Sequence, residues 1–204
     1  MFNIYLYYIN MKKLSLFLLI LFLSLPYFCL TQRNIVTDIF IVKYSETYEQ
    51  PLFMYYSVKC PQNGVSRSGL DFKLYDGVNT SDDEDYKNNV WDKGHLAPAA
   101  SFDCDKEMLK KTFTYLNCSL QHQSLNRGPW KELEEFERNL ANFYDSVSVE
   151  VECHFSVNSQ ILPTGATVPI GFTKKIQWDG REECFYFPNN ETVKGKNWIE
   201  FRIN

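Results

Sequence analysis

The chain has 204 residues, 45% of them hydrophobic and 16% aromatic, so it can bury one sizeable core and gives no reason to expect two domains. Residues 1–30 carry two lysines and no acidic residue, which leaves 19 basic and 25 acidic residues in the remainder, a formal charge of −6. This balance argues against a nucleic-acid binder, because binding phosphates normally requires a basic excess. Only a local basic groove or a bound divalent cation would reconcile the two.

Residues 1–30 have the pattern of a secretory signal peptide, with Lys12-Lys13 before an apolar run from Leu14 to Leu25. The run is shorter than the ~20 residues of a spanning helix, although Tyr27–Leu30 could lengthen it into a retained anchor. A mitochondrial presequence would be rich in arginine, and this segment has none. We therefore expect a signal peptide or an uncleaved anchor at 1–30, a single domain at 31–204 and a secreted protein, with no stable membrane partner unless the signal is retained.

Five cysteines follow residue 30, which in an oxidising compartment allows two disulfides and one free thiol. Their pairing does not follow from the sequence. Tandem C-x-x-C spacing is absent, so the sequence does not predict a structural zinc site.

Hydrophobic periodicity indicates an α+β domain with strands on both sides of one long central helix. The helix is predicted from Trp130 to Phe143, and Gly128-Pro129 either interrupts or starts it. Residues 62–89 are polar and predict loop and turns, with the acidic run 82–85 interpreted as solvated surface. The predicted strands are 35–44, 52–58, 112–120, 147–155, 169–178 and 185–187.

Three stretches of the chain combine polar, charged and aromatic residues in a recognisable order. They are W-D-K-G-H-L-A-P-A-A at 91–100, Y-L-N at 115–117, and L-N-R-G-P-W at 125–130 followed by Leu133-Glu134 and Arg138. Together they resemble the DNA/RNA non-specific endonucleases, whose D-R-G-H is followed by an Asn and then by N-x-G-x-W-x-x-L-E-x-x-x-R. The resemblance spans about residues 48–190. It implies a ββα-metal nuclease core, in which a central antiparallel sheet packs with a long helix that carries the metal ligand.

The resemblance also implies the reaction, which is hydrolysis of phosphodiester bonds in DNA and RNA with little sequence preference. Such hydrolysis needs an activated water, neutralisation of charge on the phosphate and help for the leaving alkoxide. His95 suits the first task as general base, since an ordinary histidine pKa near 6.5 leaves it largely neutral at pH 7. Asn126 would be the single direct protein ligand of Mg²⁺, with Mn²⁺ as a possible substitute, and the metal would stabilise the leaving oxygen.

Further catalytic roles come from the same resemblance. Glu134 and Arg138 lie four residues apart and could form a surface ion pair on a helix. The family instead implies that Glu134 holds a water of the metal and that Arg138 faces phosphate. Asn117 would orient His95 or that water, and Asp92 would hold the His95 loop through backbone hydrogen bonds.

Two residues are candidates for substrate binding through the phosphate backbone. Lys93 replaces the family Arg of D-R-G-H, so it keeps the positive charge but loses the planar fork that grips two oxygens. Arg67 lies five residues before Phe72 and matches a family Arg that contacts phosphate, with Lys73 as the second choice. The substitution at Lys93 and the acidic balance leave an alternative open, a catalytically weakened member that acts as a secreted nucleic-acid-binding or decoy protein.

Overall fold

The computed structural model describes residues 32–59 and 64–203, and the compact unit runs from Gln32 to Asn204. The predicted signal peptide at 1–30 lies outside the described residues. Within those residues, no helix is long and apolar enough to cross a membrane.

The framework is a seven-stranded sheet in which every neighbouring pair is antiparallel. Its strands alternate buried and more exposed residues, as expected of a sheet with one face against a core. In spatial order the strands are β1 (Gln32–Val36), β2 (Phe40–Ser45), β3 (Gln50–Ser57), β6 (Val147–His154), β7 (Gly171–Trp178), β8 (Arg181–Pro188) and β9 (Arg202–Ile203).

A second, two-stranded antiparallel sheet carries the histidine motif. Strand β4 (Trp91–His95) pairs with β5 (Cys118–His122), and the chain continues directly into helix α3 (Gln123–Asn126) and helix α4 (Pro129–Ala141). Helix α2 (Lys106–Thr112) lies between the two strands in sequence. The order strand, strand, helix is the ββα core, so the expected fold class is confirmed.

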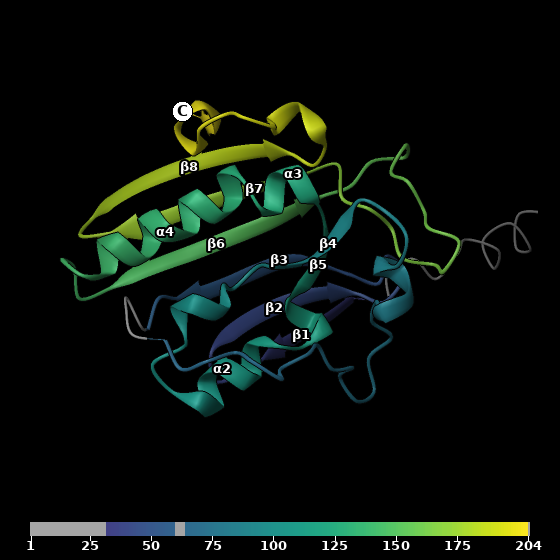
Figure 1. Cartoon of the computed structure of the whole chain (residues 1–204), viewed down its shortest axis with the longest axis horizontal. Helices are drawn as coiled ribbons and strands as arrows, with labels where there is room; N and C mark the ends of the chain where they lie inside the picture. The colour runs from purple at the N-terminus through teal and green to yellow at the C-terminus, as the bar shows by residue number, and fades with distance from the viewer. Residues whose placement is uncertain (1–31, 60–63, 204) are drawn as a thin grey trace, which may run out of the picture. The chain divides into compact units, whose positions relative to one another are not determined.

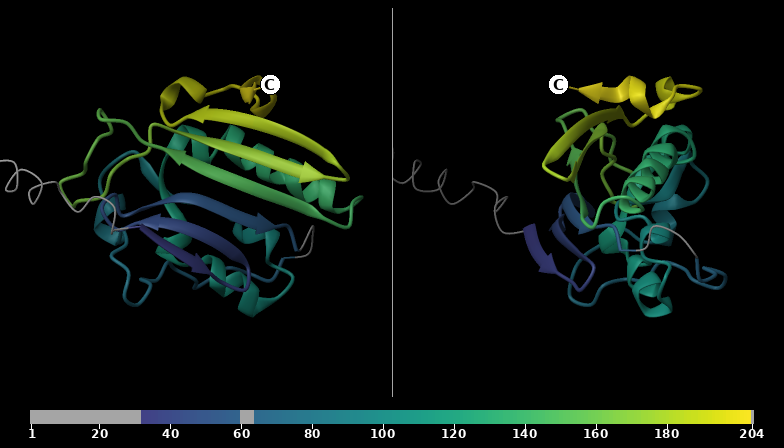
Figure 2. Two further views of the ribbon diagram at one scale, coloured as in Figure 1. Left: turned by 180° about the vertical axis from the view of Figure 1, so that it is seen from behind. Right: turned by 90° about the vertical axis from the view of Figure 1, so that its left-hand side faces the viewer.

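Helix α4 covers one face of the large sheet, as Figure 1 shows, and the view from behind in Figure 2 shows the strands uncovered by any helix of the described residues. Trp130 and Leu133 of α4 are fully buried in the core between helix and sheet. The ring of Trp130 lies 5.4 Å from that of Phe172 on β7 and 5.7 Å from that of Phe187 on β8. This packing fixes how α4 lies on the sheet.

A fully buried ion pair also ties α4 to the sheet. Lys174 on β7 lies 2.7 Å from the Oε1 of Glu137 on α4, and neither side chain is exposed. The Tyr56 hydroxyl donates to the Oε2 of Glu137 at 2.6 Å, and the Lys174 ammonium lies 4.1 Å from the Trp130 ring centroid. Each charge is therefore satisfied, which a buried charge requires.

Breaking this pair should destabilise the fold strongly. We expect Lys174→Met to lower the free energy of unfolding by about 3–5 kcal/mol, because it leaves the Glu137 carboxylate buried without its counter-charge. The matched control is Lys175→Met at the next position, whose ion pair with Glu150 is partly exposed and should contribute at most about 1 kcal/mol. Urea denaturation of both variants measures the difference, and equal losses would contradict this account.

The structure corrects several predicted elements. Residues 35–44 are not one strand: they comprise the end of β1, a turn at 37–39 and most of β2. Residues 112–120 are not a single strand: they comprise the end of α2, a 3-10 turn (Tyr115–Asn117) and the start of β5. The alternation of polar and apolar residues there reflects capping, since the Thr114 side chain accepts from the backbone of that turn.

The helix that was expected to carry Asn126 is divided. Asn126 ends the short α3, and the long α4 starts only at Pro129, after the cap residue Gly128. A Cβ on Gly128 would lie 2.6 Å from the Ser124 carbonyl oxygen, so only glycine permits this break. Pro129 then suits the first helical position, where no backbone N–H is needed. The metal-ligand candidate thus lies on the helix before the long one.

The cysteines also differ from expectation. Cys118, Cys153 and Cys184 are free thiols, so the arrangement of two disulfides and one free thiol is wrong. Cys118 and Cys153 are buried on β5 and β6, where they pack as small apolar side chains. Cys104 is disulfide-bonded, and Cys60 lies outside the described residues.

Candidate active site

A cavity of about 470 Å³ lies where β4, α3, α4 and the segment around Arg67 meet. Five of its eleven lining residues are basic and one is acidic, which makes it a local basic pocket in a chain of acidic balance. Of the seven site residues predicted from sequence, the cavity collects six: Arg67, Lys93, His95, Asn126, Glu134 and Arg138. Asn117 is fully buried and does not line the cavity.

His95 ends β4 and is held between two aromatic rings. Its ring centroid lies 4.6 Å from that of Phe72 and 4.9 Å from that of Phe113. Its Nε2 is buried and has no hydrogen-bond partner. Burial, reinforced by the nearby positive charge of Arg67, lowers the pKa of His95 to about 3. The imidazole is therefore neutral, in the proton-accepting form, throughout the neutral pH range.

Asn117 fixes the loop that follows His95. Its Oδ1 accepts from the Ala97 backbone N–H at 2.7 Å, and its Nδ2 donates to the carbonyl oxygens of Ala97 at 2.9 Å and Thr112 at 3.0 Å. The Leu96 N–H also donates to the Asn117 carbonyl oxygen. All of the Asn117 amide is engaged with backbone, an arrangement that suits orienting His95 and leaves nothing to contact a metal's water.

Asp92 engages side chains, and the prediction that it binds the loop backbone is corrected. Its carboxylate accepts from the Asn126 Nδ2 at 3.0 Å and from the Arg127 Nε and Nη2 at 2.8 and 2.6 Å. Burial opposes ionisation, but the bonds from Arg127 and Asn126 outweigh it and lower the pKa of Asp92. An ionised carboxylate only accepts hydrogen bonds, so it fixes the NH₂ side of the Asn126 amide and leaves Oδ1 free.

The lining of the cavity determines what kind of metal it suits. Within residues 32–59 and 64–203, no cluster of three or more His, Cys, Asp or Glu side chains could hold a metal ion. The side-chain oxygen donors that line the cavity are the Asn126 amide and the Glu134 carboxylate. Hard oxygen donors in small number fit Mg²⁺, which keeps most of its waters and takes one or two protein oxygens.

Glu134 and Arg138 both line the cavity, yet no ion pair within 4.0 Å joins these two described residues. The interpretation as a surface ion pair is therefore wrong. The Nη1 of Arg138 is buried and has no hydrogen-bond partner. An unpartnered guanidinium in a cavity needs an anion, and a phosphate oxygen matches its donors.

The pH dependence of the site should follow Glu134. Burial raises the pKa of Glu134 to about 7, against the opposing charges of Lys174 and Arg138. The carboxylate is the form that would hold a water of the metal, so kcat/KM should rise with pH as Glu134 ionises, with a midpoint at or below about 7 because a bound cation favours the carboxylate. His95, with its pKa near 3, should add no further limb above pH 5. A pH–rate profile from 5 to 9 checks this. In Glu134→Gln the remaining rate should lack this limb, and a limb that persists would contradict the assignment.

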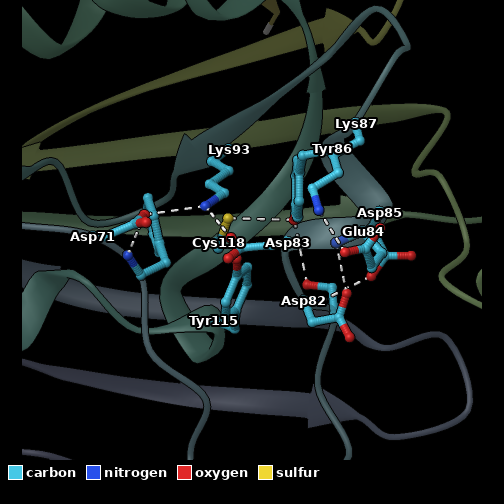
Figure 3. A network of polar contacts seen from close by, with 12 residues as sticks. Asp71, Asp82, Asp83, Glu84, Asp85, Tyr86, Lys87, Lys93, Tyr115 and Cys118 are labelled. Atoms are coloured by element: carbon cyan, nitrogen blue, oxygen red, sulfur yellow. Dashed lines mark hydrogen bonds and ion pairs between the residues drawn. The ribbon is translucent and has the colours of Figure 1, made fainter.

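Lys93 reaches the cavity edge with its charge already balanced. Its ammonium lies 3.1 Å from the Asp71 Oδ1 and forms a second ion pair with Asp83, as Figure 3 shows. It also lies 5.7 Å from the Phe72 ring centroid and 5.5 Å from that of Tyr115. The acidic run is thus folded against the site at Asp83, and the prediction that it is simply solvated surface is wrong.

Two basic residues of the cavity were missed from the sequence, Arg127 and Lys131. Arg127 is bound to Asp92 through two hydrogen bonds, whereas no carboxylate of the described residues lies within 4.0 Å of Lys131. Helical spacing could have identified Lys131, because positions 131, 134 and 138 fall on one face of α4. The free cations of the cavity are therefore Arg67, Lys131 and Arg138.

The comparisons with known proteins agree with this architecture. A model of the DNA/RNA non-specific endonuclease family matches residues 30–204, and the chain belongs to that family. Mitochondrial endonuclease G of Bos taurus is 33% identical over 87 residues, covering 41% of this chain and 29% of that protein. The mitochondrial nuclease of Saccharomyces cerevisiae is 31% identical over 106 residues, covering 45% of this chain and 32% of that protein. The matches thus span about a third of the curated relatives' length.

The fold has a solved counterpart in an EndoG/EndoGI complex. The structures superpose with a TM-score of 0.75 at 21% sequence identity, over 84% of this chain and 80% of that one. This likeness supports the ββα-metal nuclease fold.

These relatives overturn the prediction of a secreted protein. The named nucleases of Bos taurus, Homo sapiens and Saccharomyces cerevisiae are mitochondrial. The lack of arginine in residues 1–30, on which a mitochondrial protein was discounted, does not outweigh these mitochondrial relatives.

Proposed function

We propose that the protein is a metal-dependent endonuclease that hydrolyses phosphodiester bonds in DNA and RNA with little sequence preference. The observation that carries the proposal is the basic cavity, in which a neutral histidine, a free amide oxygen and an unpartnered guanidinium converge. A pocket with these groups matches the needs of phosphodiester hydrolysis, which are a base, a cation and donors for phosphate oxygens.

In this proposal His95 accepts the proton of the attacking water. Its neutral form and its unpartnered Nε2 suit a base, and Phe72 and Phe113 hold the ring in place. Bound phosphate would place negative charge beside the imidazole and offset the positive charge of Arg67. This negative charge would stabilise the protonated imidazole once it has taken the proton. Asn117 is a positioning residue that holds the loop after His95.

The free cations Arg67, Lys131 and Arg138 neutralise the phosphate in this account. They line one cavity and have no carboxylate within 4.0 Å among the described residues, so their donors are available to phosphate oxygens. Contacts to the backbone carry no base information, so they support cleavage with little sequence preference.

The residues that would hold the metal are Asn126 directly and Glu134 through water. The Asn126 Oδ1 is free because Asp92 engages the other side of the amide, and Glu134 lines the same cavity. When bound, Mg²⁺ would supply Lewis acidity at the phosphate and stabilise the leaving oxygen. Mn²⁺ also accepts such oxygen donors and is proposed as a substitute.

The proposal includes a mitochondrial location, which the mitochondrial relatives support. Fractionation of cells that express the full chain should recover the protein with mitochondria. Recovery from the culture medium would contradict this part of the proposal.

Substrate range tests the proposed activity. Single-stranded DNA, duplex DNA and RNA of matched sequence should all be cleaved with Mg²⁺, and mapping the new ends should show cuts spread over many sequence steps. Cleavage should stop with EDTA and return with added Mg²⁺. Cutting at one defined sequence would contradict recognition through the phosphate backbone of the nucleic acid. Tight binding without any cleavage would favour the alternative of a catalytically weakened family member.

A further inference from the structure

The acidic residues beside Lys93 have no part in the proposed chemistry, although they pair with a residue that lines the cavity. Asp71 and Asp83 come from different segments and both bind the Lys93 ammonium, as Figure 3 shows. An ammonium has three N–H donors, and two of them are directed at carboxylates here. The Lys93 side chain is 25% exposed, so it still borders the cavity.

The position of Asp83 is strongly fixed. Its carboxylate also accepts a hydrogen bond from the Tyr115 hydroxyl. It opens a 3-10 turn (Asp83–Tyr86) with a reciprocal capping box, in which Asp82 accepts from the Glu84 N–H and Asp85 accepts from the Asp82 N–H. Asp85 is buried and bound by the Thr164 hydroxyl. The turn therefore presents Asp83 to Lys93 as a built feature of the fold.

The charges explain what this contact does to substrate binding. Two carboxylates outweigh the single positive charge of Lys93, so a phosphate that approaches the remaining N–H meets net negative charge unless it displaces one of them. The pairing also holds Lys93 in its protonated form, because the hydrogen bonds to Asp83 and Asp71 outweigh burial and raise its pKa. The charge of Lys93 is thus present but directed at the protein itself.

We propose that Asp71 and Asp83 compete with the phosphate backbone of the substrate for Lys93, and that this competition limits the affinity of the site for nucleic acid. The inference rests on the proposed nuclease function. It makes Asp83 and Asp71 affinity-determining residues, and it gives the acidic run a role at the site. Lys93 then differs from the free cations Arg67, Lys131 and Arg138, which bind phosphate without displacing an internal carboxylate.

Salt dependence of binding tests the competition. Each phosphate neutralised by a protein cation adds about 0.9 to the slope of log affinity against log salt for duplex DNA. All proteins carry His95→Ala so that duplex binding can be measured with Mg²⁺ present and cleavage suppressed. In this background, Asp71→Asn/Asp83→Asn should bind several-fold more tightly and steepen the slope by about 0.9. Asparagine retains an acceptor for Tyr115 and for the Phe72 N–H, so the local fold is kept.

The matched control removes two other exposed carboxylates from lysine pairs. Glu84→Gln/Glu107→Gln breaks the pairs with Lys87 and Lys110, changes the net charge equally and should leave the slope unchanged. Adding Lys93→Met to the Asp71→Asn/Asp83→Asn protein should restore the parent slope, because Lys93 is the cation that was released. If the double neutralised protein does not fold, Asp71→Asn alone, at a 73% exposed side chain, should show the same direction of change.

The outcomes separate the two proposals. Weaker binding after neutralisation would show that the acids position Lys93, and would overturn the competition. A tighter binding equal to that of the control would mean a general charge effect, and would also overturn it. If the protein that carries only His95→Ala binds no nucleic acid, and wild type cleaves none, the proposed nuclease function itself fails. If wild type cleaves nucleic acid but Asp71→Asn/Asp83→Asn leaves the salt-dependence slope unchanged, only the proposed competition for Lys93 is overturned.

Discussion

Replacing His95 with alanine is expected to lower kcat by about 10²–10⁴-fold, the usual contribution of a general base, while KM stays close to that of wild type. The histidine is neutral and its Nε2 has no protein partner, so it is free to take a proton during the reaction. The binding groups are other residues, mainly Arg67, Lys131 and Arg138, and they remain in place. Steady-state kinetics on a fluorescent duplex gives kcat and KM separately.

The control for this variant is His154→Ala. His154 lies on β6, bonded to Thr173 at 2.7 Å, and it does not line the cavity. This variant should keep kcat within a few-fold of wild type. A thermal melt confirms that both variants are folded. If His95→Ala keeps its kcat, or if both variants lose kcat equally, His95 is not the base.

Replacing Asn126 with alanine is expected to raise the Mg²⁺ concentration for half-maximal cleavage by about 100-fold or more, because losing the direct protein ligand should cost at least as much as losing a residue that orients it. Asp92→Ala should raise it by about 10–100-fold, the usual effect of losing a residue that orients a metal ligand. The reason is that Asp92 holds the Asn126 Nδ2 at 3.0 Å and so aims the free Oδ1. Cleavage rates over a Mg²⁺ titration give both values.

Asn139→Ala provides the matched control, because Asn139 is an exposed asparagine on α4 outside the cavity. Its Mg²⁺ titration should overlay that of wild type. The metal assignment is wrong if Asn126→Ala and Asn139→Ala have the same Mg²⁺ requirement. The metal assignment is also wrong if Asn126→Ala cleaves slowly even in excess Mg²⁺ while its half-maximal Mg²⁺ concentration equals that of wild type. The amide would then act on the rate without binding the metal.

Much of the site could be anticipated from sequence because the relevant residues occur in a recognisable order. His95, Asn126 and Glu134 belong to three different elements, so the hydrophobic periodicity of any one element does not show that they meet. The structure gathers them through the β4–β5 pairing and the α3–α4 connection. Of the two candidates for the upstream phosphate contact, Arg67 lines the same cavity and Lys73 does not.

Other features depended on contacts that are not local in sequence. The carboxylates of Asp71 and Asp83 become meaningful only when both reach Lys93, which lies 22 and 10 residues away. Burial against Phe72 and Phe113 lowers the pKa of His95 below the ordinary histidine value, and the sequence alone does not show that burial. An amphipathic pattern shows neither the pairing of Asp71 and Asp83 with Lys93 nor the burial of His95.

Secondary structure was predicted best where one face packs on the core. The pattern of α4 and of the long strands β3, β6 and β7 is imposed by the helix–sheet core, so periodicity identified them. Residues 112–120 misled because capping side chains imitate a strand pattern. The glycine break at 128 was open in sequence, since a glycine before proline can either interrupt or start a helix.

Nicking of supercoiled plasmid by the purified protein tests most directly whether this chain is a metal-dependent nuclease. Wild type should convert the plasmid to open-circle and linear forms at neutral pH with Mg²⁺, lose this activity with EDTA and regain it when Mg²⁺ is restored. His95→Ala from the same preparation procedure should leave the plasmid supercoiled. Nicking that survives EDTA, or equal nicking by wild type and His95→Ala, would contradict the account.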